Sequence, residues 1–260
     1  MKKYLDISRC ERLLAPVRFE FLPEIDSTNE YLKREVKQSN SVSDTLVCAE
    51  RQVKGKGTRG RVWYDSPQCC LKFSYRKQLP TNFSKFAVIS PWVALNFCQY
   101  LHSVGFQTVG AKWPNDLLIN GGKLSGMLFE IVSKGEVSYL IAGIGVNLFF
   151  DPNLTEISGR NIAFLYEKFT PSIDERTDIL IELGRVLIDS LDNIPESFTD
   201  EDKMSWSACD VFYQKKVKII QDGKVVDEGC EMGIDKEGRL MVQTSEGLKS
   251  INIGELSVTL

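Results

Sequence analysis

The stretch Gln52 to Trp63 reads Q-V-K-G-K-G-T-R-G-R-V-W and alternates glycines with cationic side chains. The glycines are Gly55, Gly57 and Gly60, and the cations are Lys54, Lys56, Arg59 and Arg61. Glycine reaches positive φ and lets main-chain N–H groups approach an anion closely. Lysine and arginine add charge-assisted hydrogen bonds to such a cradle. This stretch therefore predicts a phosphate-binding loop.

The spacing Gly55-x-Gly57-x-x-Gly60 also matches the dinucleotide-binding fingerprint, which needs a strand before the glycines and a helix after them. Residues 45–49 are apolar and partly β-branched, which predicts the strand. Residues 62–67 have turn chemistry and cannot begin a helix. The sequence contains no G-x-x-x-x-G-K-[ST] phosphate loop either. A solvated surface loop is the alternative interpretation, so a binding function requires partner residues elsewhere in the chain.

The composition is that of an ordinary globular protein, with 43% hydrophobic and 26% charged residues among 260. This length suits one large domain and one small one. The net charge is −3 and the sequence pI is about 5.5, which argues against general nucleic-acid binding. The N-terminal residues lack the apolar region of a signal peptide, and the longest apolar run, residues 137–150, is too short and glycine-rich to span a bilayer. We therefore expect a cytoplasmic protein with no membrane partner.

Seven cysteines form no C-x-x-C pair and no metal-ligand spacing, and their odd number suits a reducing cytosol. His102 is the only histidine, so Ser-His-Asp, Cys-His and histidine–zinc chemistry are excluded unless this residue carries them. It lies near the end of an apolar helical pattern, where we expect a structural role.

Ser27 and Glu30 have the S-x-x-E spacing of a capping box, which predicts a helix beginning here with Leu32 and Val36 facing inward. In that case Ser27 has a structural role, worth about 1 kcal/mol. Thr28 and the neighbouring N–H groups would at the same time offer hydrogen bonds to a polar ligand. The two roles are compatible.

Hydrophobic periodicity predicts further elements along the chain. Helices are predicted at residues 84–104, 174–194 and 196–206, and strands at residues 71–75, 109–113, 117–119, 123–132 and 137–148. Beyond residue 211 the pattern changes to short β-rich runs separated by glycine turns, which predicts a small β-barrel. We expect two domains, residues 1–208 and residues 209–260.

A hairpin is predicted where Asn120-Gly-Gly122 separates two strands. Its return would bring Lys123 toward the segment Lys112-Trp-Pro-Asn-Asp116, so that two lysines, an amide and a carboxylate share one corner of a sheet. In the alternative interpretation, Lys112 and Lys123 keep an exposed edge strand from pairing with other chains, and Asn115 and Asp116 form a turn. With the glycine loop, a phosphate site built from two segments is the better account. In the next strand, Gly143 and Gly145 leave room for a ligand.

Taken together, these motifs resemble those of the biotin–protein ligase family. The matching segments are Ser27–Asn29, Gln52–Trp63, Lys112–Asp116, Lys123–Gly126, Gly143–Asn147, Gly233–Gly238 and Gly254–Ser257. Each motif alone is weak, but their joint order and spacing from about residue 20 onward are specific. The resemblance implies an α+β fold, with a mixed or antiparallel sheet and flanking helices like the core of class II aminoacyl-tRNA synthetases. A small C-terminal barrel like a Src-homology-3 domain would follow.

The resemblance implies a reaction in two steps. The biotin carboxylate attacks the α-phosphate of ATP, giving biotinyl-5′-adenylate and pyrophosphate. A lysine of the biotin carboxyl carrier protein of acetyl-CoA carboxylase then attacks this anhydride. Both substrates of the first step are anionic, so cationic side chains must offset their repulsion. Neither step needs a protein nucleophile, so a single histidine is no obstacle.

The resemblance also implies roles for individual residues. The residues that assist adenylation would be Lys123, Lys112 and Arg61. The residues that bind biotin would be Ser27, Thr28, Asn29, Gln52, Lys56, Gly57, Thr58 and Lys123. The residues that bind ATP or the adenylate would be Gly55, Arg59, Gly60, Asn115, Asp116 and Asn147. Mg²⁺ is expected with ATP, held through water by Asp116, and Trp63 and Trp113 are candidates for apolar walls.

The sequence departs from the family pattern in the loop. The family commonly has G-R-G-R-x-G-R, whereas Lys56 and Thr58 stand at the first two arginine positions here. Lys56 keeps the charge without the bidentate fork, and Thr58 loses the charge, which predicts weaker retention of biotinyl-adenylate. Some relatives carry an N-terminal DNA-binding helix-turn-helix, for which the residues before Ser27 leave no room, so no DNA partner is expected. Dimers are frequent in the family, but a homodimer has no signature in these residues.

Other functions stay open. Lipoate–protein ligases share the core fold and a K-x-x-G element like Lys123–Gly126, but their usual consecutive glycines with a following histidine-aspartate pair are absent. A non-catalytic biotin or adenylate sensor would keep the binding residues without the chemistry. The presence of Lys112, Lys123 and Asp116 favours an enzyme over a sensor. A synthetase-related nucleotide-binding remnant is a third alternative.

Overall fold

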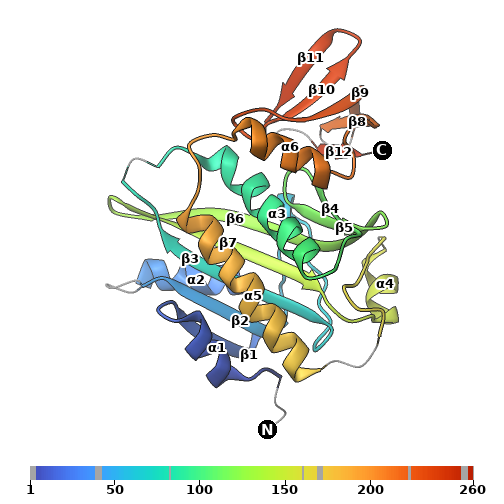
Figure 1. Cartoon of the computed structure of the whole chain (residues 1–260). Coiled ribbons are helices and arrows are strands. Elements are labelled where there is room, and N and C mark those ends of the chain that lie inside the picture. The colour runs from blue at the N-terminus through green and yellow to red at the C-terminus, as the bar shows by residue number, and fades with distance from the viewer. Residues whose placement is uncertain are drawn as a thin grey trace. The chain divides into compact units, whose positions relative to one another are not determined.

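The computed structural model describes residues 4–38, 43–81, 83–159, 161–168, 172–221, 224–252 and 257–259. Contacts group the chain into two compact units, which are drawn with their elements in Figure 1. Unit 1 contains residues 1–83 and 121–189, and unit 2 contains residues 84–120 and 190–260. The domains predicted from the sequence, residues 1–208 and 209–260, stay a prediction. Most of the predicted Gly254–Ser257 motif lies outside the described residues.

Unit 1 is built on five strands in the spatial order β1-β2-β3-β7-β6. Their bounds are β1 Arg18–Ile25, β2 Thr45–Gln52, β3 Cys70–Gln78, β6 Gly122–Lys134 and β7 Val137–Asn147. Strands β1 and β2 are parallel, and the pairs β2–β3, β3–β7 and β6–β7 are antiparallel. The sheet is therefore mixed, as the sequence predicts.

Helices cover both faces of these strands (Figure 1). They are α1 Ile7–Leu14, α2 Thr28–Gln38, α4 Pro152–Ser158 and α5 Ile173–Asp192. Because side chains alternate along a strand, neighbouring residues of β2 meet different helices. Val47 belongs to a core cluster with Leu32 and Val36 of α2, whereas Leu46 lies beside Gly184 of α5. Helix α2 therefore covers one face and α5 the other.

The predicted helix does begin next to Ser27, and Leu32 and Val36 are fully buried. The predicted capping box is wrong. The Ser27 N–H donates to Asp26 Oδ1 at 2.8 Å, which removes the donor that Glu30 would have accepted from. The Glu30 carboxylate instead accepts from two lysines, Lys33 and Lys56. The reciprocal bond from the Ser27 N–H to Glu30 is therefore absent, whereas capping by the Ser27 side chain stays a prediction.

Unit 2 combines helices with two sets of strands. Its helices are α3 Phe86–Ser103 and α6 Asp200–Cys209, and its first strands are β4 Val109–Lys112 and β5 Asp116–Ile119. The remaining strands are β8 Lys216–Gln221, β9 Lys224–Ile234, β10 Leu240–Thr244, β11 Gly247–Ile251 and β12 Ser257–Thr259. They form an antiparallel sheet in the order β11-β10-β9-β8-β12, where the sequence predicts short β-rich runs.

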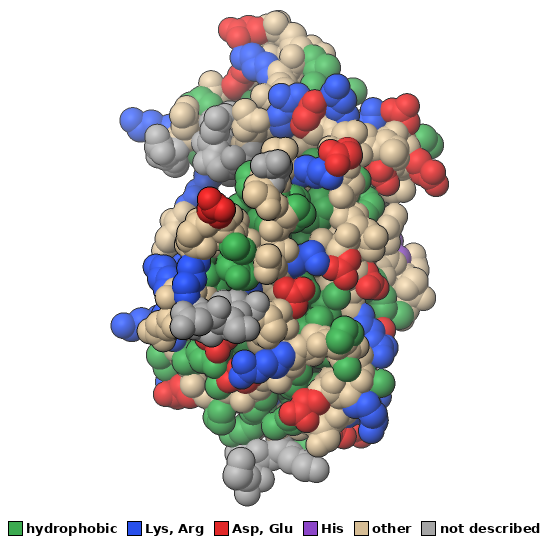
Figure 2. Space-filling view, turned by 90° about the vertical axis from the view of Figure 1, so that its left-hand side faces the viewer, with side chains coloured by type: hydrophobic (Ala, Val, Ile, Leu, Met, Phe, Trp, Pro, Cys, Tyr) green, Lys and Arg blue, Asp and Glu red, His purple; other side chains and the backbone are tan. Residues whose placement is uncertain are grey.

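No helix among the described residues combines the length and the apolar character needed to cross a bilayer. On the face drawn in Figure 2, the described lysine and arginine side chains are interspersed with aspartate and glutamate. This mixed surface agrees with the small net charge of −3.

Candidate active site

The first part of the site is a buried hydrogen-bond network between α2 and the strands beneath it. Gln52 Oε1 accepts from the Thr28 N–H at 2.7 Å and from Thr28 Oγ1 at 3.0 Å. Ser74 Oγ lies 2.6 Å from both Thr28 Oγ1 and Asn29 Oδ1. Thr28 and Asn29 are each only 3% exposed. Three of the predicted biotin-binding residues, Thr28, Asn29 and Gln52, are therefore joined by one network, and Ser27 is buried next to them.

Charged side chains connect this network to the glycine loop. Asn29 Nδ2 donates to Glu130 Oε2 at 2.8 Å, and Lys33 Nζ bridges Glu130 and Glu30. Glu30 then accepts from Lys56 Nζ of the loop at 2.6 Å. Hydrogen bonds from Lys33 and Lys56 hold the pKa of Glu30 below its ordinary value. The carboxylate therefore stays charged and fixes Lys56 beside α2.

The glycine loop is a small hairpin of its own. The Gly57 N–H donates to Arg61 O at 2.7 Å, and the Trp63 N–H donates to Gly55 O at 3.1 Å. Of the three loop glycines, Gly60 is the one with a positive φ, 70°. Gly55 supplies space instead, because a Cβ there would lie 2.5 Å from Trp63 O. The non-glycine residue Arg59 takes the other positive φ, 58°.

The loop places the Trp63 indole over two glycines of the sheet. A Cβ on Gly145 would lie 2.5 Å from the ring, and one on Gly126 would lie 3.2 Å from it. These glycines are opposite each other in the β6–β7 pair. Lys123 Nζ lies 5.9 Å from the centre of the Trp63 ring, within cation–π range. Trp63 Nε1 is buried and has no hydrogen-bond partner among the described residues, so it is a donor available to a ligand.

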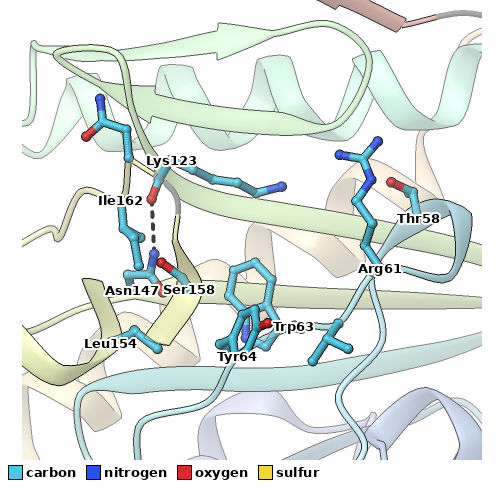
Figure 3. A pocket seen from close by; sticks show the side chains of 12 residues that line it. Thr58, Arg61, Trp63, Tyr64, Lys123, Asn147, Leu154, Ser158 and Ile162 are labelled. Carbon is cyan, nitrogen blue, oxygen red and sulfur yellow. Dashed lines mark hydrogen bonds between the residues drawn. The ribbon is translucent and has the colours of Figure 1, made fainter. Parts of the chain in front are cut away.

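These segments line an open cavity of about 560 Å³, a volume that includes space open to solvent. The loop contributes one side, with Arg61 and Thr58, and the other side is formed by Asn147 together with α4 and the segment after it (Figure 3). Asn147 Nδ2 donates to Lys123 O at 3.0 Å, which fixes the ends of β6 and β7 together. Of the predicted residues, the lining includes Gly57, Thr58, Arg61, Lys123 and Asn147.

Several contributors escape sequence reasoning. The cavity is also lined by Val62, Tyr64, Leu154, Ser158, Asn161 and Ile162. Those after β7 belong to no motif, although Asp151 and Pro152 have the residue types of a helix start. Asp65 holds the start of the loop in place. Its carboxylate accepts from the Gln52 N–H at 2.6 Å and from the buried Lys72 Nζ at 2.5 Å. Val62, Tyr64 and Asp65 lie in or next to the loop in sequence, whereas only the fold brings the lining residues 154, 158, 161 and 162 to the site.

The remaining predicted residues belong to unit 2. Lys112 and Asp116 are directly opposite each other in the β4–β5 pair, with Asn115 in the turn between them. Lys112 Nζ lies 5.4 Å from the centre of the Phe212 ring. Trp113 is 2% exposed and donates to Gly238 O at 3.0 Å, so it belongs to the core of unit 2. The convergence of Lys112 and Asp116 with Lys123 stays a prediction.

Chemically, the unit 1 site offers a neutral and a cationic part. The neutral part is the buried set of hydroxyl and amide groups around Thr28, which suits a polar uncharged ring. The cationic part is Lys123 and Arg61 at the cavity, which suits carboxylate and phosphate groups. A single molecule with an uncharged polar ring and an acidic tail would use both.

The fold and this site define a class of protein. A model of the biotin/lipoate A/B protein ligase family matches residues 21–147, which include the glycine loop, Lys123 and Asn147. A model of the biotin protein ligase C-terminal domain matches residues 215–258. The class is therefore that of the biotin and lipoate ligases.

Individual relatives narrow this class. The bifunctional ligase/repressor BirA of Escherichia coli is 30% identical over 242 residues, which cover 91% of this chain and 73% of BirA. The biotin–[acetyl-CoA-carboxylase] ligase of Mycobacterium tuberculosis is 25% identical over 249 residues, 92% of this chain and 88% of that one. The structure of the biotin protein ligase from Aquifex aeolicus in complex with biotin and ATP matches with a TM-score of 0.71 and 27% identity, covering 93% and 98% of the two chains. The chain belongs to the biotin protein ligase family.

Proposed function

We propose that this chain is an ATP-dependent ligase that attaches biotin to a lysine of the biotin carboxyl carrier protein of acetyl-CoA carboxylase, through biotinyl-5′-adenylate. The observation that carries this proposal is the single cavity lined by the glycine loop, Lys123 and Asn147. These three elements come from separate parts of the sequence, and all lie within the residues 21–147 that match the family model. The names of the Mycobacterium tuberculosis and Aquifex aeolicus relatives support the activity and its target.

Biotin would bind with its ureido ring at the buried network. The ring needs both donors and acceptors, and Ser27, Thr28, Asn29 and Gln52 supply hydroxyl and amide groups at this place. Gly143 makes room for Asn29 in this network, because a Cβ there would lie 2.2 Å from Asn29 Oδ1. The carboxylate tail would then extend toward Lys123. Lys56, Gly57 and Thr58 of the loop would close over it.

The adenylation chemistry would depend on cations and on exclusion of water. Lys123 and Arg61 would offset the repulsion between the biotin carboxylate and the α-phosphate. The buried Trp63 N–H, which has no partner among the described residues, would donate to an oxygen of the bound ligand. Gly55, Arg59, Gly60 and Asn147 would border the nucleotide, and an ordered loop would shield the anhydride from water.

Roles for the unit 2 residues follow the family resemblance. Lys112, Asn115 and Asp116 would act on the ATP phosphates. Mg²⁺ prefers carboxylate and phosphate oxygens and keeps several waters, so Asp116 fits an indirect, water-mediated contact with the ion that accompanies ATP. The finer fold assignments, a class II synthetase-like core and a Src-homology-3-like C-terminal barrel, agree with the mixed sheet of unit 1 and the antiparallel sheet of unit 2.

The test is transfer of labelled biotin to purified carrier protein. We expect labelling of one lysine that requires ATP and fails with lipoate in place of biotin. Transfer of lipoate would move the assignment to the lipoate branch of the family. Tight biotin binding without transfer, with a carrier that a known ligase does label, would favour a non-catalytic sensor.

A further inference from the structure

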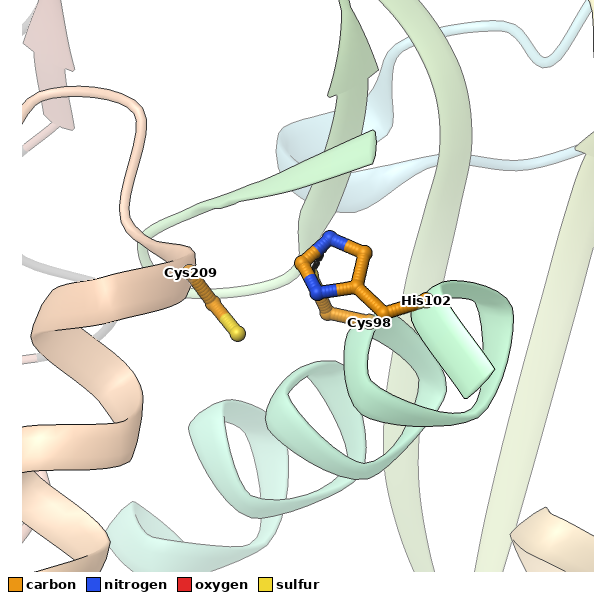
Figure 4. Close-up of side chains that lie close together, drawn as sticks. All are labelled: Cys98, His102 and Cys209. Carbon is orange, nitrogen blue, oxygen red and sulfur yellow. Dashed lines mark hydrogen bonds between the residues drawn. The ribbon is translucent and has the colours of Figure 1, made fainter. Parts of the chain in front are cut away.

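Three potential metal ligands meet in unit 2, and none of them has a binding or catalytic role in the site described above. Cys98 and His102 are four residues apart in α3, and Cys209 is the last residue of α6. Figure 4 shows the thiol of Cys209 pointing toward the other two side chains. One ligand atom from each residue lies within 4.8 Å of the other two. Helical i, i+4 spacing plus one residue from a second helix is a common way to build such a group.

The separation of the Cys98 and His102 ligand atoms suits a tetrahedral ion. Cys98 Sγ and His102 Nε2 are 3.6 Å apart. Zinc bonds of about 2.3 Å to sulfur and about 2.0 Å to nitrogen at a tetrahedral angle put the two ligand atoms about 3.5 Å apart. Cys98 and Cys209 are 0% and 7% exposed, and His102 is half-buried. The group is therefore enclosed on the sulfur side and reachable by solvent on the imidazole side.

The hydrogen bonds within this group indicate what an ion would replace. His102 Nε2 lies 2.6 Å from Val109 O, and Cys98 Sγ lies 3.5 Å from the same oxygen. A carbonyl oxygen only accepts, so protons occupy the space in which these groups converge. An ion would replace them, with the thiols deprotonated and the imidazole proton moved to Nδ1.

We propose that Cys98, His102 and Cys209 form a binding site for a soft divalent transition-metal ion of the Zn²⁺ class. Two thiolates and one imidazole select such ions over Mg²⁺, which requires oxygen ligands. Three protein ligands leave a fourth position for water. A buried cluster held only by hydrogen bonds, or a Cys98–Cys209 disulfide, is the competing account.

A metal ion at this site would link α3 and α6 next to strand β4, which carries the predicted catalytic residue Lys112. Val211, two residues after Cys209, donates its N–H to Ala111 O at 2.9 Å. Ala111 directly precedes Lys112 in β4, and Val109 is the residue at which the cluster contacts this strand. An ion joining α3 and α6 here would stabilise the backbone that carries Lys112.

The experiment is an anaerobic titration of the reduced full chain with Co²⁺, followed by displacement with Zn²⁺. We expect one equivalent per chain, with thiolate-to-cobalt charge-transfer absorption. Cys209→Ser and His102→Gln should abolish this absorption, while Cys230→Ser, which removes a thiol outside the cluster, should leave it unchanged. The melting temperature of the wild type should rise with Zn²⁺ concentration, and that of Cys209→Ser should not.

X-ray absorption of the zinc-loaded wild type tests the ligands without any substitution. Two sulfur neighbours and one imidazole nitrogen would support the proposal. A shell without sulfur, or Co²⁺ absorption that persists in Cys209→Ser, would overturn it. So would a reduced wild-type chain that binds no Co²⁺, whether or not it forms a Cys98–Cys209 disulfide in air.

Discussion

At the scale of single residues, the site depends on where side chains are missing as much as on where they are present. Gly143 makes room for Asn29, and Gly126 and Gly145 make room for Trp63. Because protein interiors are close-packed, one added methyl group at such a position displaces its neighbour. We predicted from the sequence that Gly143 and Gly145 leave space for a ligand. In the structure they accommodate the side chains of Asn29 and Trp63.

Gly143→Ala should weaken biotin binding. A Cβ would lie 2.2 Å from Asn29 Oδ1, so Asn29 must move and lose its bond to Ser74. With about 0.5–1.5 kcal/mol for each lost hydrogen bond, we expect a loss of affinity of about tenfold. Isothermal titration with biotin measures it. Ala142→Gly, on the opposite face of β7, is the control: it should lower thermal stability and leave biotin affinity unchanged, and equal affinity losses in both variants would contradict the account.

Glu30→Gln should lower stability at neutral pH but not in acid. The bonds from Lys33 and Lys56 hold the folded-state pKa of Glu30 below its ordinary value of 4.5. The contribution is therefore complete above pH 4.5 and is lost as the pH falls through the lower folded-state pKa. We expect a difference in unfolding free energy of about 0.5–1 kcal/mol at neutral pH, measured by urea denaturation, that shrinks as the pH falls below 4.5. Glu24→Gln, in an exposed pair with Arg51 outside the loop, is the control for general charge effects. A difference that persists in acid would contradict the assignment.

At the scale of elements, much of the fold could be predicted because hydrophobic periodicity is strong in buried strands and amphipathic helices. The strands later seen as β2, β3, β6 and β7 and the helices α3 and α5 lie where the pattern places them. Helix α1 and strand β1 were not predicted. Helix α1 is short, and β1 contains Pro23, a residue that usually argues against a strand. Strand β1 lies at the outer position of the strand order, where proline is tolerated.

Some site residues could likewise be predicted from the sequence, and others could not. Motif residues such as Lys123 and Arg61 could be predicted to line a site, because their neighbours in sequence identify them. The walls from α4 and the following segment could not, because their place depends on how the chain returns after β7. We predicted no metal-ligand spacing among the cysteines, because Cys209 comes from a distant helix and only the fold shows that it meets Cys98 and His102.

Within the loop, Thr58→Arg should slow the release of biotinyl-adenylate. Thr58 lines the cavity, where a guanidinium could form charge-assisted bonds that threonine cannot. A gain of about 1.4 kcal/mol corresponds to a tenfold slower release. The measurements are the dissociation rate of the adenylate and the stray labelling of bystander lysines during turnover. Thr58→Met, of similar reach without charge, should have no such effect. If the wild type labels no bystander lysines and Thr58→Arg releases the adenylate at the same rate, weak retention by the loop is contradicted.

At the scale of the whole molecule, the two family models match different segments of the chain. The biotin/lipoate ligase match spans the glycine loop and Lys123 of unit 1, and the C-terminal match spans the antiparallel sheet of unit 2. The central claim concerns unit 1: a cavity in which Lys123 neutralises two anions that must react. This claim can be tested without the carrier protein, because adenylation precedes transfer.

The most direct measurement is biotin-dependent exchange of labelled pyrophosphate into ATP, for the wild type, Lys123→Ala and Lys134→Ala. Lys134 ends the same strand far from the cavity, so it controls for the loss of a lysine from β6. The account predicts exchange that requires biotin, ignores lipoate, falls by at least about a hundredfold in Lys123→Ala and is unchanged in Lys134→Ala. Exchange that persists in Lys123→Ala, or that lipoate drives as well as biotin, would contradict it.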